Sequence, residues 1–311
     1  MSSERRGEQP GRREQIGQRP FCSEVSAARG EPIGATASRV DRWLLVEYGG
    51  YWPYDPLDAA VFAGSLRERL AERLRSLGSA KLLLTKRPGR ARRDRVEVIY
   101  GATPERGTWF RRLELDHHGE LADLDLGPDG PGDPLDHPLL LVCTHGIRDR
   151  CCARYGQALA RTLNRLADPE WLRHVSHVGG DRFAANLVAL PEGIYFGRVA
   201  PGHASSVLAA YLEGRIDLDH YRGRSSWPFP GQAAEIAVRR ERSLTGFHDV
   251  RVEQIRAAGG DRWEVTVLAE LAGDRFVVDV GLEHGEPVYL TCRATQERAP
   301  RRFVASLRET T

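Results

Sequence analysis

Two short stretches carry residue types that bind transition metals. Residues 143–152 read CTHGIRDRCC and hold three of the chain's five cysteines, and residues 174–181 read HVSHVGGD, with two histidines three positions apart. Cysteine thiolates and imidazole nitrogens are ligands of zinc and of iron–sulfur clusters. The same residues also suit thiols packed under a loop and a histidine in a core. The spacing therefore leaves both a metal site and a structural role open.

The first stretch needs a strand and a helix to position it. LLLVC (139–143) is a short apolar run typical of a buried parallel strand, and residues 153–166 place leucines on one helical face. Cys143 therefore ends a predicted strand and Cys152 begins a predicted helix, so the loop between them can aim both sulfurs at one centre. The positive end of the helix should lower the pKa of the Cys152 thiol. The side chain of Cys151 should diverge, and we interpret it as a packed or spare thiol.

The second stretch offers nitrogen and oxygen ligands. His177 precedes Gly179 and Gly180, which allow the backbone to turn tightly beside a bulky group. His174 and Asp181 flank His177. Any two of these three polar side chains could complete a metal site.

Four neighbouring polar residues have structural interpretations. His145 follows a cysteine as in one half of a Rieske site, but the second Cys-x-His pair is absent, so that interpretation fails. We expect His145 to lie behind the ligands or on an exposed loop. Arg148 and Asp149 should pair and brace the loop, and Arg182 should donate to a bound group or to a partner.

The remaining sequence predicts an α/β fold with a thioredoxin-like core. Strands and one amphipathic helix alternate in the first half, at 42–48, 65–78, 81–86, 95–100 and 109–115. This rhythm is typical of a layered α/β fold. The second half continues as strand, loop, helix, a hairpin across Pro191–Gly193 and a helix over 205–214. That is the element order of the core half of a thioredoxin-like fold.

The last part of the chain predicts a small α+β domain. A helix over 233–244 precedes four runs that alternate at period two, at 250–257, 262–271, 274–282 and 287–292. We therefore divide the chain into a disordered tail (1–20), an α/β domain (21–225) and a C-terminal α+β domain (228–311).

Composition limits the kinds of partner and compartment. A net charge of +2, with 41% apolar and 28% charged residues, is ordinary for a soluble globular protein and predicts neither a nucleic-acid nor a membrane partner. The chain has no 18-residue apolar run, and its N-terminus has no apolar signal core. Clustered cysteines fit a reducing compartment, so we predict the cytoplasm. Only Lys81 and Lys86 are lysines, which we interpret as the sign of a GC-rich bacterial genome.

Two loop segments are given modest interpretations. KRPGRARRDR (86–95) is either a solvated hairpin loop or a docking patch for an acidic partner. Residues 121–138 alternate aspartates as a calcium loop does, but Pro134 stands where the closing glutamate is needed. We interpret this segment as a linker.

Three segments carry a resemblance to a known family: CTHGIRDRCC (143–152), SHVGGDRFAANLVALPEGIYFGRV (176–199) and residues 21–52. Together they resemble the sucrase/ferredoxin-like family of thioredoxin-like [2Fe–2S] proteins. The resemblance runs roughly from Cys22 to Tyr221. It implies an electron-transfer protein with a [2Fe–2S] cofactor and a redox partner protein, a reductase or an acceptor, rather than a stand-alone enzyme.

The resemblance also implies the ligands. Family members use two cysteines nine positions apart and an H-x-x-x-H pair, which correspond here to Cys143, Cys152, His177 and position 181. That position holds Asp181 instead of histidine. Three fourth ligands are open at this point, namely Asp181, His174 or water; we favour Asp181.

Two other functions use the same residues. A thiol-based redox enzyme would employ Cys143 or Cys152 as a reactive thiolate, although the usual C-x-x-C pair is absent. A zinc-binding structural or interaction protein would use the same four side chains as a tetrahedral site. Cys22 and Cys292 need no role beyond that of buried thiols. The oligomeric state stays open.

Overall fold

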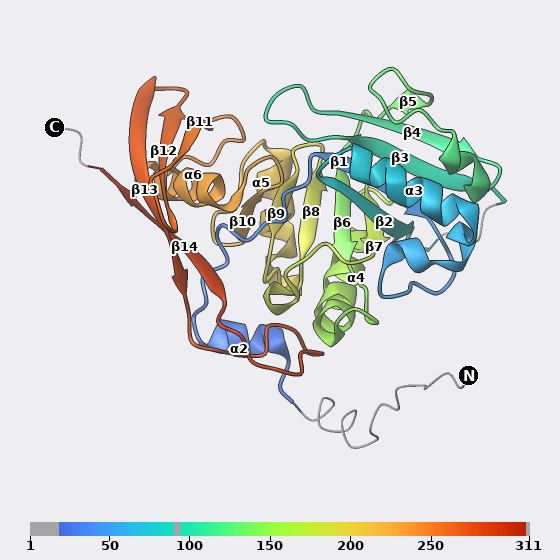
Figure 1. Ribbon diagram of the computed structural model, residues 1–311, viewed down its shortest axis with the longest axis horizontal. Helices are drawn as coiled ribbons and strands as arrows, with labels where there is room; N and C mark the ends of the chain where they lie inside the picture. The colour runs from blue at the N-terminus through green and yellow to red at the C-terminus, as the bar shows by residue number, and fades with distance from the viewer. Residues whose placement is uncertain (1–18, 90–93, 309–311) are drawn as a thin grey trace.

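The computed structural model describes residues 19–89 and 94–308 as a mixed α/β protein dominated by one large curled sheet (Figure 1). The predicted α/β class is confirmed. Residues 1–18 of the predicted tail (1–20) and residues 90–93 of the basic segment (86–95) lie outside the described residues. Within the described ranges, no helix combines the length and the apolar character that crossing a bilayer requires.

The first half of the large sheet follows the prediction closely. Its elements are β1 (Arg42–Glu47), α3 (Ser65–Ser76), β2 (Ala80–Lys86), β3 (Val96–Ala102), β4 (Trp109–Leu115) and the two-residue β5 (Asp133–Pro134). β1 and β2 are parallel and are joined through α3, so they form a βαβ unit. These elements could be predicted from the sequence because their apolar residues alternate or form continuous runs.

The second half contains two strands that the sequence pattern did not indicate. Its elements are β6 (Leu139–Cys143), α4 (Gln157–Leu166), β7 (Leu172–Val175), β8 (Leu187–Leu190), β9 (Ile194–Phe196), α5 (Ala204–Leu212) and β10 (Tyr221–Arg224). β7 and β10 were missed because both carry buried arginines, at Arg173 and at Arg222 and Arg224. Charged side chains in a four-residue run hide the apolar signal of a buried strand.

The large sheet curls until its two halves meet. The strand order is β10-β9-β8-β6-β7-β2-β1-β3-β4-β5. The rings of Trp43 on β1 and Tyr195 on β9 nevertheless lie 6.3 Å apart between centroids. A flat sheet would hold these two strands about 24 Å apart. The curl therefore creates a shared inner face, which comprises Trp43, Leu45, Leu83, Ile99, Leu141, Cys143, Cys152, Val175, Val188 and Tyr195, among others.

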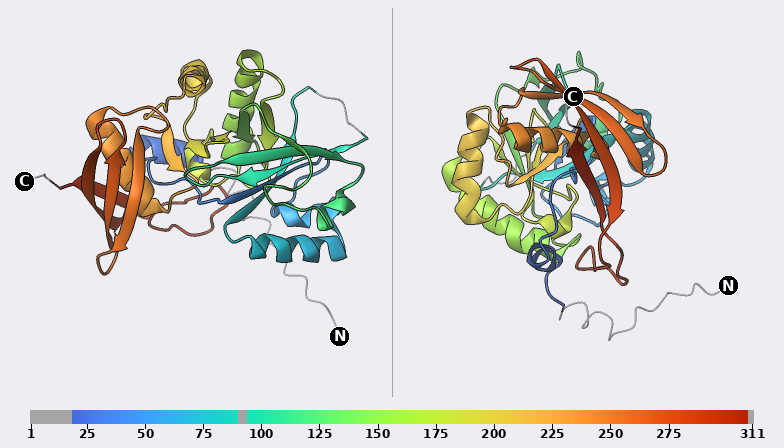
Figure 2. Two further views of the ribbon diagram at one scale, coloured as in Figure 1. Left: turned by 90° about the horizontal axis from the view of Figure 1, so that it is seen from above. Right: turned by 90° about the vertical axis from the view of Figure 1, so that its left-hand side faces the viewer.

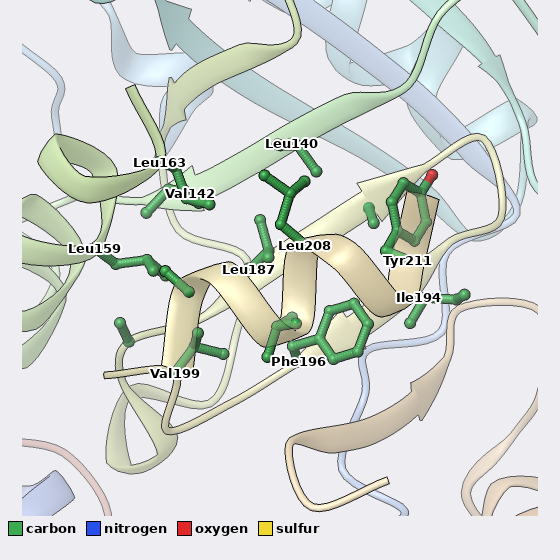
Figure 3. Close-up of a cluster of buried hydrophobic side chains, with 14 of the residues drawn as sticks. Leu140, Val142, Leu159, Leu163, Leu187, Ile194, Phe196, Val199, Leu208 and Tyr211 are labelled. Atoms are coloured by element: carbon green, nitrogen blue, oxygen red, sulfur yellow. The ribbon is translucent and has the colours of Figure 1, made fainter. Parts of the chain in front are cut away.

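Helices cover the opposite, outer face of the sheet. α4 and α5 pack on the half around β6, where Leu159, Leu163 and Leu208 contact the strands (Figure 3). α3 covers the half around β1, with Leu70 fully buried. Leu166, which was predicted on the apolar face of its helix, is 48% exposed because α4 ends there. Figure 2 shows these helices in two further views.

The C-terminal part forms a four-stranded antiparallel sheet against one helix. Its elements are α6 (Phe229–Arg242), β11 (Val250–Ala257), β12 (Arg262–Ala269), β13 (Asp274–His284) and β14 (Arg301–Leu307). The predicted strand at 287–292 is wrong: residues 285–300 form an irregular connection, and the fourth strand begins at Arg301. This connection crosses to α2 (Cys22–Ala28), and Figure 1 shows the two segments together. The proposed domain boundaries stay a prediction.

A buried carboxylate clamps the junction between the two halves of the large sheet. β2 and β7 meet there through two residue pairs. Glu97 of β3 binds Arg173 of β7 at 2.9 Å, Arg112 of β4 at 2.7 Å, and Arg87, which follows β2. Burial by itself would raise the pKa of Glu97, but the three guanidinium groups outweigh burial and hold that pKa below its ordinary value.

Replacing Glu97 by glutamine should lower the free energy of unfolding at neutral pH by about 3–5 kcal/mol, because Arg173 would stay buried without a counter-charge and Arg87 would keep its ion pair with the partly exposed Glu170 alone. The measurement is urea unfolding of variant and wild type. Because the folded pKa is depressed, the contribution of Glu97 is present above about pH 4.3 and lost as the pH falls through the folded pKa. The difference between the two proteins should therefore shrink in acid.

The control for this experiment is Asp58→Asn, which removes an ion pair with Arg67 at 2.8 Å whose side chains are 52% and 47% exposed. Exposed pairs contribute about 0–1 kcal/mol. If both variants lose equally little free energy of unfolding, Glu97 does not stabilise the junction.

Candidate metal centre

The pairing of two parallel strands brings the first cysteine and the histidine together. β6 and β7 are parallel, with Cys143 opposite Val175. The backbone stays extended beyond β7, since the N–H of Ser176 donates to the carbonyl of Leu84 at 2.9 Å. Side chains alternate between the faces of a strand, so His177 lies on the same face as Val175 and Cys143. That face is the inner face of the curled sheet.

Cys152 reaches the same place through the loop that follows β6. The loop ends in a π-helical turn, Cys152–Gly156, which continues into α4. π-helical turns are rare and occur mostly at functional sites. Gly156 lies against the carbonyl of Cys143, where even a methyl group would collide with the backbone. This close approach holds Cys152 against the end of β6.

Three of the four predicted side chains converge on one point, and Asp181 contacts two of them. Donor atoms of Cys143, Cys152 and His177 all lie within 4.8 Å of one another. Oδ1 of Asp181 accepts from Sγ of Cys152 at 3.4 Å and lies 3.1 Å from Nδ1 of His177. Both cysteines are 1% exposed, Asp181 is 5% exposed, and the His177 side chain is 16% exposed. One side of this cluster is thus close to solvent.

The donor set fits a thiophilic metal. Two sulfurs, an imidazole nitrogen and a carboxylate oxygen are the usual ligands of zinc, and thiolates with imidazoles also hold iron–sulfur clusters. Nδ1 of His177 is buried and meets hydrogen-bond geometry with no described residue, although Oδ1 of Asp181 lies 3.1 Å away. A metal ion bound between these groups would satisfy the ring nitrogen.

The two thiols ionise unequally. The pKa of Cys143 lies well below its usual range, chiefly because the neighbouring thiol of Cys152 donates to its sulfur. Burial acts in the opposite direction, while His177 and the backbone N–H of Val178 lower the pKa further. The same contact with Cys143, together with burial, raises the pKa of Cys152 well above its usual range. The pair therefore shares one proton, and a metal cation would displace it.

The second arm is fixed by a buried arginine. Gly179 and Gly180 have φ of 100° and 80°, a left-handed region that glycine occupies without strain. Arg222 on β10 donates to the carbonyl of Gly179 at 3.0 Å and to Oδ1 of Asn186 at 2.8 Å. Nδ2 of Asn186 donates to the carbonyl of Gly180 at 2.8 Å. These bonds hold the turn between His177 and Asp181.

A family model described as sucrase/ferredoxin-like matches residues 33–223. The chain belongs to this family. The predicted recognition is confirmed, and the four converging side chains all lie inside the matched stretch.

Relatives of the chain include yeast proteins named Altered inheritance of mitochondria protein 32. The protein from Meyerozyma guilliermondii is 33% identical over 95 residues, which are 27% of this chain and 34% of the relative. Those from Eremothecium gossypii and Clavispora lusitaniae are 32% and 31% identical over 116 and 100 residues, 32% and 30% of this chain and 37% of each relative. The matches thus span about a third of these relatives' length. No solved structure matches the chain.

These comparisons correct two predictions. The prediction of a [2Fe–2S] electron-transfer protein is wrong: the relatives' name refers to the inheritance of mitochondria, and neither that name nor the family description says that a member carries electrons. The prediction of a bacterial origin is contradicted because these relatives come from yeasts. Arginine usage is a poor guide to origin.

The structure separates His174 from the family's site. His174 lies beside Val142 in the parallel pair, one residue before the position opposite Cys143. It therefore points to the outer face of the sheet, away from Cys143 and His177. His174 cannot replace Asp181 without flipping the strand.

Two neighbouring interpretations need correction, and one open alternative is decided. His145 is 2% exposed, which excludes the exposed-loop alternative, and its Nε2 donates to the carbonyl of Trp52 at 3.3 Å. Arg148 does not pair with Asp149, because it stacks on the ring of Tyr54 at 3.9 Å. Arg182 binds Glu31 at 2.8 Å.

Sequence reasoning missed other polar groups near the site. Lys81 of β2 lies beside Trp43 on the inner face, and burial lowers its pKa to about 8. Its signal was a lysine within an apolar strand of an arginine-rich chain. Cys22, Cys151 and Cys292 were interpreted as unconnected thiols, yet they meet around Asp149. No sequence signal joins residues so far apart.

Replacing Gly156 by alanine should destabilise the protein by about 1–3 kcal/mol, although alanine is the better helix former, because the new methyl group would push α4 away from the Cys143 carbonyl. Urea unfolding measures this cost. Gly202→Ala is the control, since no atom lies within 4 Å of a methyl group there, and its effect should stay within about 0.5 kcal/mol. Equal effects at the two positions would show that the close approach does not constrain the site.

Proposed function

We propose that this protein binds a metal at a centre formed by Cys143, Cys152, His177 and Asp181. The observation that carries the proposal is the convergence of two buried sulfurs and an imidazole nitrogen within 4.8 Å, from three separate segments of the chain. Packing of apolar groups does not require such a set. A shared centre explains why each of these polar groups is held there.

Asp181 is the fourth ligand in this proposal. Its Oδ1 already contacts both Cys152 and His177, at 3.4 and 3.1 Å. A carboxylate adds a negative charge where the family pattern has a neutral imidazole. Together with two thiolates, the carboxylate gives a ligand charge of about −3, which exceeds the charge of a divalent ion. The site would therefore favour the more highly charged metal forms.

We also propose that the core around the centre is thioredoxin-like. The order β9-β8-β6-β7, with β6 and β7 parallel and β8 and β9 antiparallel to their neighbours, supports this. α4 follows β6 and α5 follows β9, and both pack on the same face. In this arrangement, Cys152 begins the helix after the first core strand.

The five cysteines are free thiols. This supports the proposal of a reducing compartment such as the cytoplasm. The relatives' name describes a cellular process, and because the matches cover about a third of their length we propose only the metal centre for this chain.

Wild-type protein purified without oxygen should contain bound metal, measured by elemental analysis. Visible absorbance that dithionite bleaches would identify the metal group as a [2Fe–2S] cluster, whereas a colourless protein with zinc would identify a single ion. Either result supports this centre when Cys152→Ser removes the metal. Folded wild-type protein that binds neither iron nor zinc would refute it.

Cys152→Ser and His177→Ala should each lose the metal of this centre almost completely, more than the roughly 10–100-fold weakening that follows loss of a group behind a ligand. His174→Gln is the matched control, because that imidazole lies on the outer face beside Val142. It should retain the wild-type metal content. Equal loss of metal from all three variants would mean that the substitutions act by destabilising the fold and do not remove ligands.

Asp181→Ala should weaken metal retention under chelator challenge, while Asp181→His should keep it, since histidine restores the family's ligand pattern. The measurement is the rate of metal release to excess EDTA. Faster release from Asp181→Ala, with Asp181→His close to wild type, would support Asp181 as a ligand; unchanged release in Asp181→Ala would exclude it.

A further inference from the structure

A second group of sulfurs lies apart from the proposed centre. Cys22 begins α2, Cys151 precedes the π-helical turn, and Cys292 lies in the connection between β13 and β14. The Sγ atoms are 3.5 Å apart between Cys22 and Cys151, 3.4 Å between Cys151 and Cys292, and 3.6 Å between Cys292 and Cys22. All three residues are at most 4% exposed. Their sulfurs form a nearly equilateral triangle.

The size of this triangle matches one metal ion. Sulfurs at the usual zinc distance of about 2.3 Å, arranged tetrahedrally, lie about 3.8 Å from one another. The observed separations are within a few tenths of an ångström of that value. Sulfurs that bind different irons of a cluster stand further apart. The spacing therefore favours a single ion.

Asp149 supplies a fourth donor. It is fully buried, and its two oxygens accept the backbone N–H groups of Cys151 at 2.8 Å and Cys292 at 2.7 Å. Both oxygens lie 3.9 Å from Sγ of Cys22. A carboxylate oxygen has two lone pairs, so each retains one for a metal. The backbone bonds fix the carboxylate beside the sulfurs.

Hydrogen bonds to the sulfurs suit thiolates. The N–H of Cys22 donates to Sγ of Cys292 at 3.4 Å, and Oγ of Ser23 donates to Sγ of Cys151 at 3.2 Å. Donors aimed at ligand atoms are the usual surroundings of a metal site. They stabilise negative charge on sulfur, which neutral packed thiols would not need.

A route for an ion is also present. A surface cavity of about 260 Å³ is lined by Cys22 and Cys292, with Arg19, Tyr289 and Thr291 around its rim. An ion entering there would meet two of the sulfurs first. An access route is one of the requirements of a metal site.

We propose that Cys22, Cys151, Cys292 and Asp149 form a second metal site, which takes a single thiophilic divalent ion of the zinc class. On binding, each thiol releases its proton to solvent. Cys22 and Cys292 lie outside residues 33–223, the stretch matched by the family model. The ion links α2 and the β13–β14 connection to the loop before α4, so its role is structural.

The experiment measures zinc and iron per chain in reduced, full-length wild type, Cys292→Ser and Cys152→Ser, all purified without oxygen. We expect Cys292→Ser to lose one zinc relative to wild type and Cys152→Ser to keep that zinc. Thr291→Ala, on the rim of the cavity, is the matched control and should keep it too. If Cys152→Ser loses metal and Cys292→Ser loses none, the first centre holds and this second site is refuted.

A second measurement covers the case in which Cys292→Ser does not fold. Wild-type protein is alkylated before and after EDTA, and the modified cysteines are mapped by mass spectrometry. Cys22, Cys151 and Cys292 should become alkylated much faster after chelation, together with increased proteolysis of residues 285–300. Alkylation that EDTA does not change, or a disulfide between any two of these cysteines in the wild type, overturns the proposal.

Discussion

The parallel register of β6 and β7 is the constraint on which the rest of the site depends. Because Cys143 stands opposite Val175, strands β6 and β7 end side by side, and His177 follows on the inner face. A slip of one residue would turn His177 to the outer face, where His174 now lies. The π-helical turn and the Gly179–Gly180 turn both lie at these strand ends.

The register itself is held by neighbours rather than by β7 alone. β7 is four residues long, and its contact with β2 is short. Arg173 compensates by reaching across to Glu97, which also binds arginines beside β2 and on β4. Buried ion pairs of this kind are strong only when complete, since loss of one partner leaves a charge in the core. The clamp thus connects the stability of the sheet to the geometry of the centre.

The curl of the sheet gives the centre its surroundings. The inner face removes both cysteines from water while His177 keeps part of its edge near solvent. On the other side of the same loop, Cys151 points away from Cys152 toward α2 and the β13–β14 connection. Two adjacent cysteines therefore face two different groups of thiols. The segment from Asp149 to Cys152 is where the N-terminal helix, the family core and the C-terminal sheet meet.

The sequence by itself determined the elements whose apolar pattern is uninterrupted, and it was enough to propose the principal donors. β1, α3, β6 and the β8–β9 hairpin could be predicted because local periodicity reports which face of an element is buried. Cys143, Cys152 and His177 could be proposed because their spacing within two short stretches is a local property. Cys151 was correctly expected to diverge, since adjacent side chains on a helix point in different directions.

Only the tertiary structure decided the rest. β7 and β10 are strands because their arginines find buried partners elsewhere, which no window of four residues can reveal. The run at 287–292 has a strand pattern, yet it is drawn away to contact Asp149 and Cys22. The face on which His174 lies depends on its pairing with Val142 and Lys86, which are 32 and 88 positions away. The meeting of Cys22, Cys151 and Cys292 joins residues more than a hundred positions apart. Such contacts are set by how sheets and connections pack, and local sequence carries no record of them.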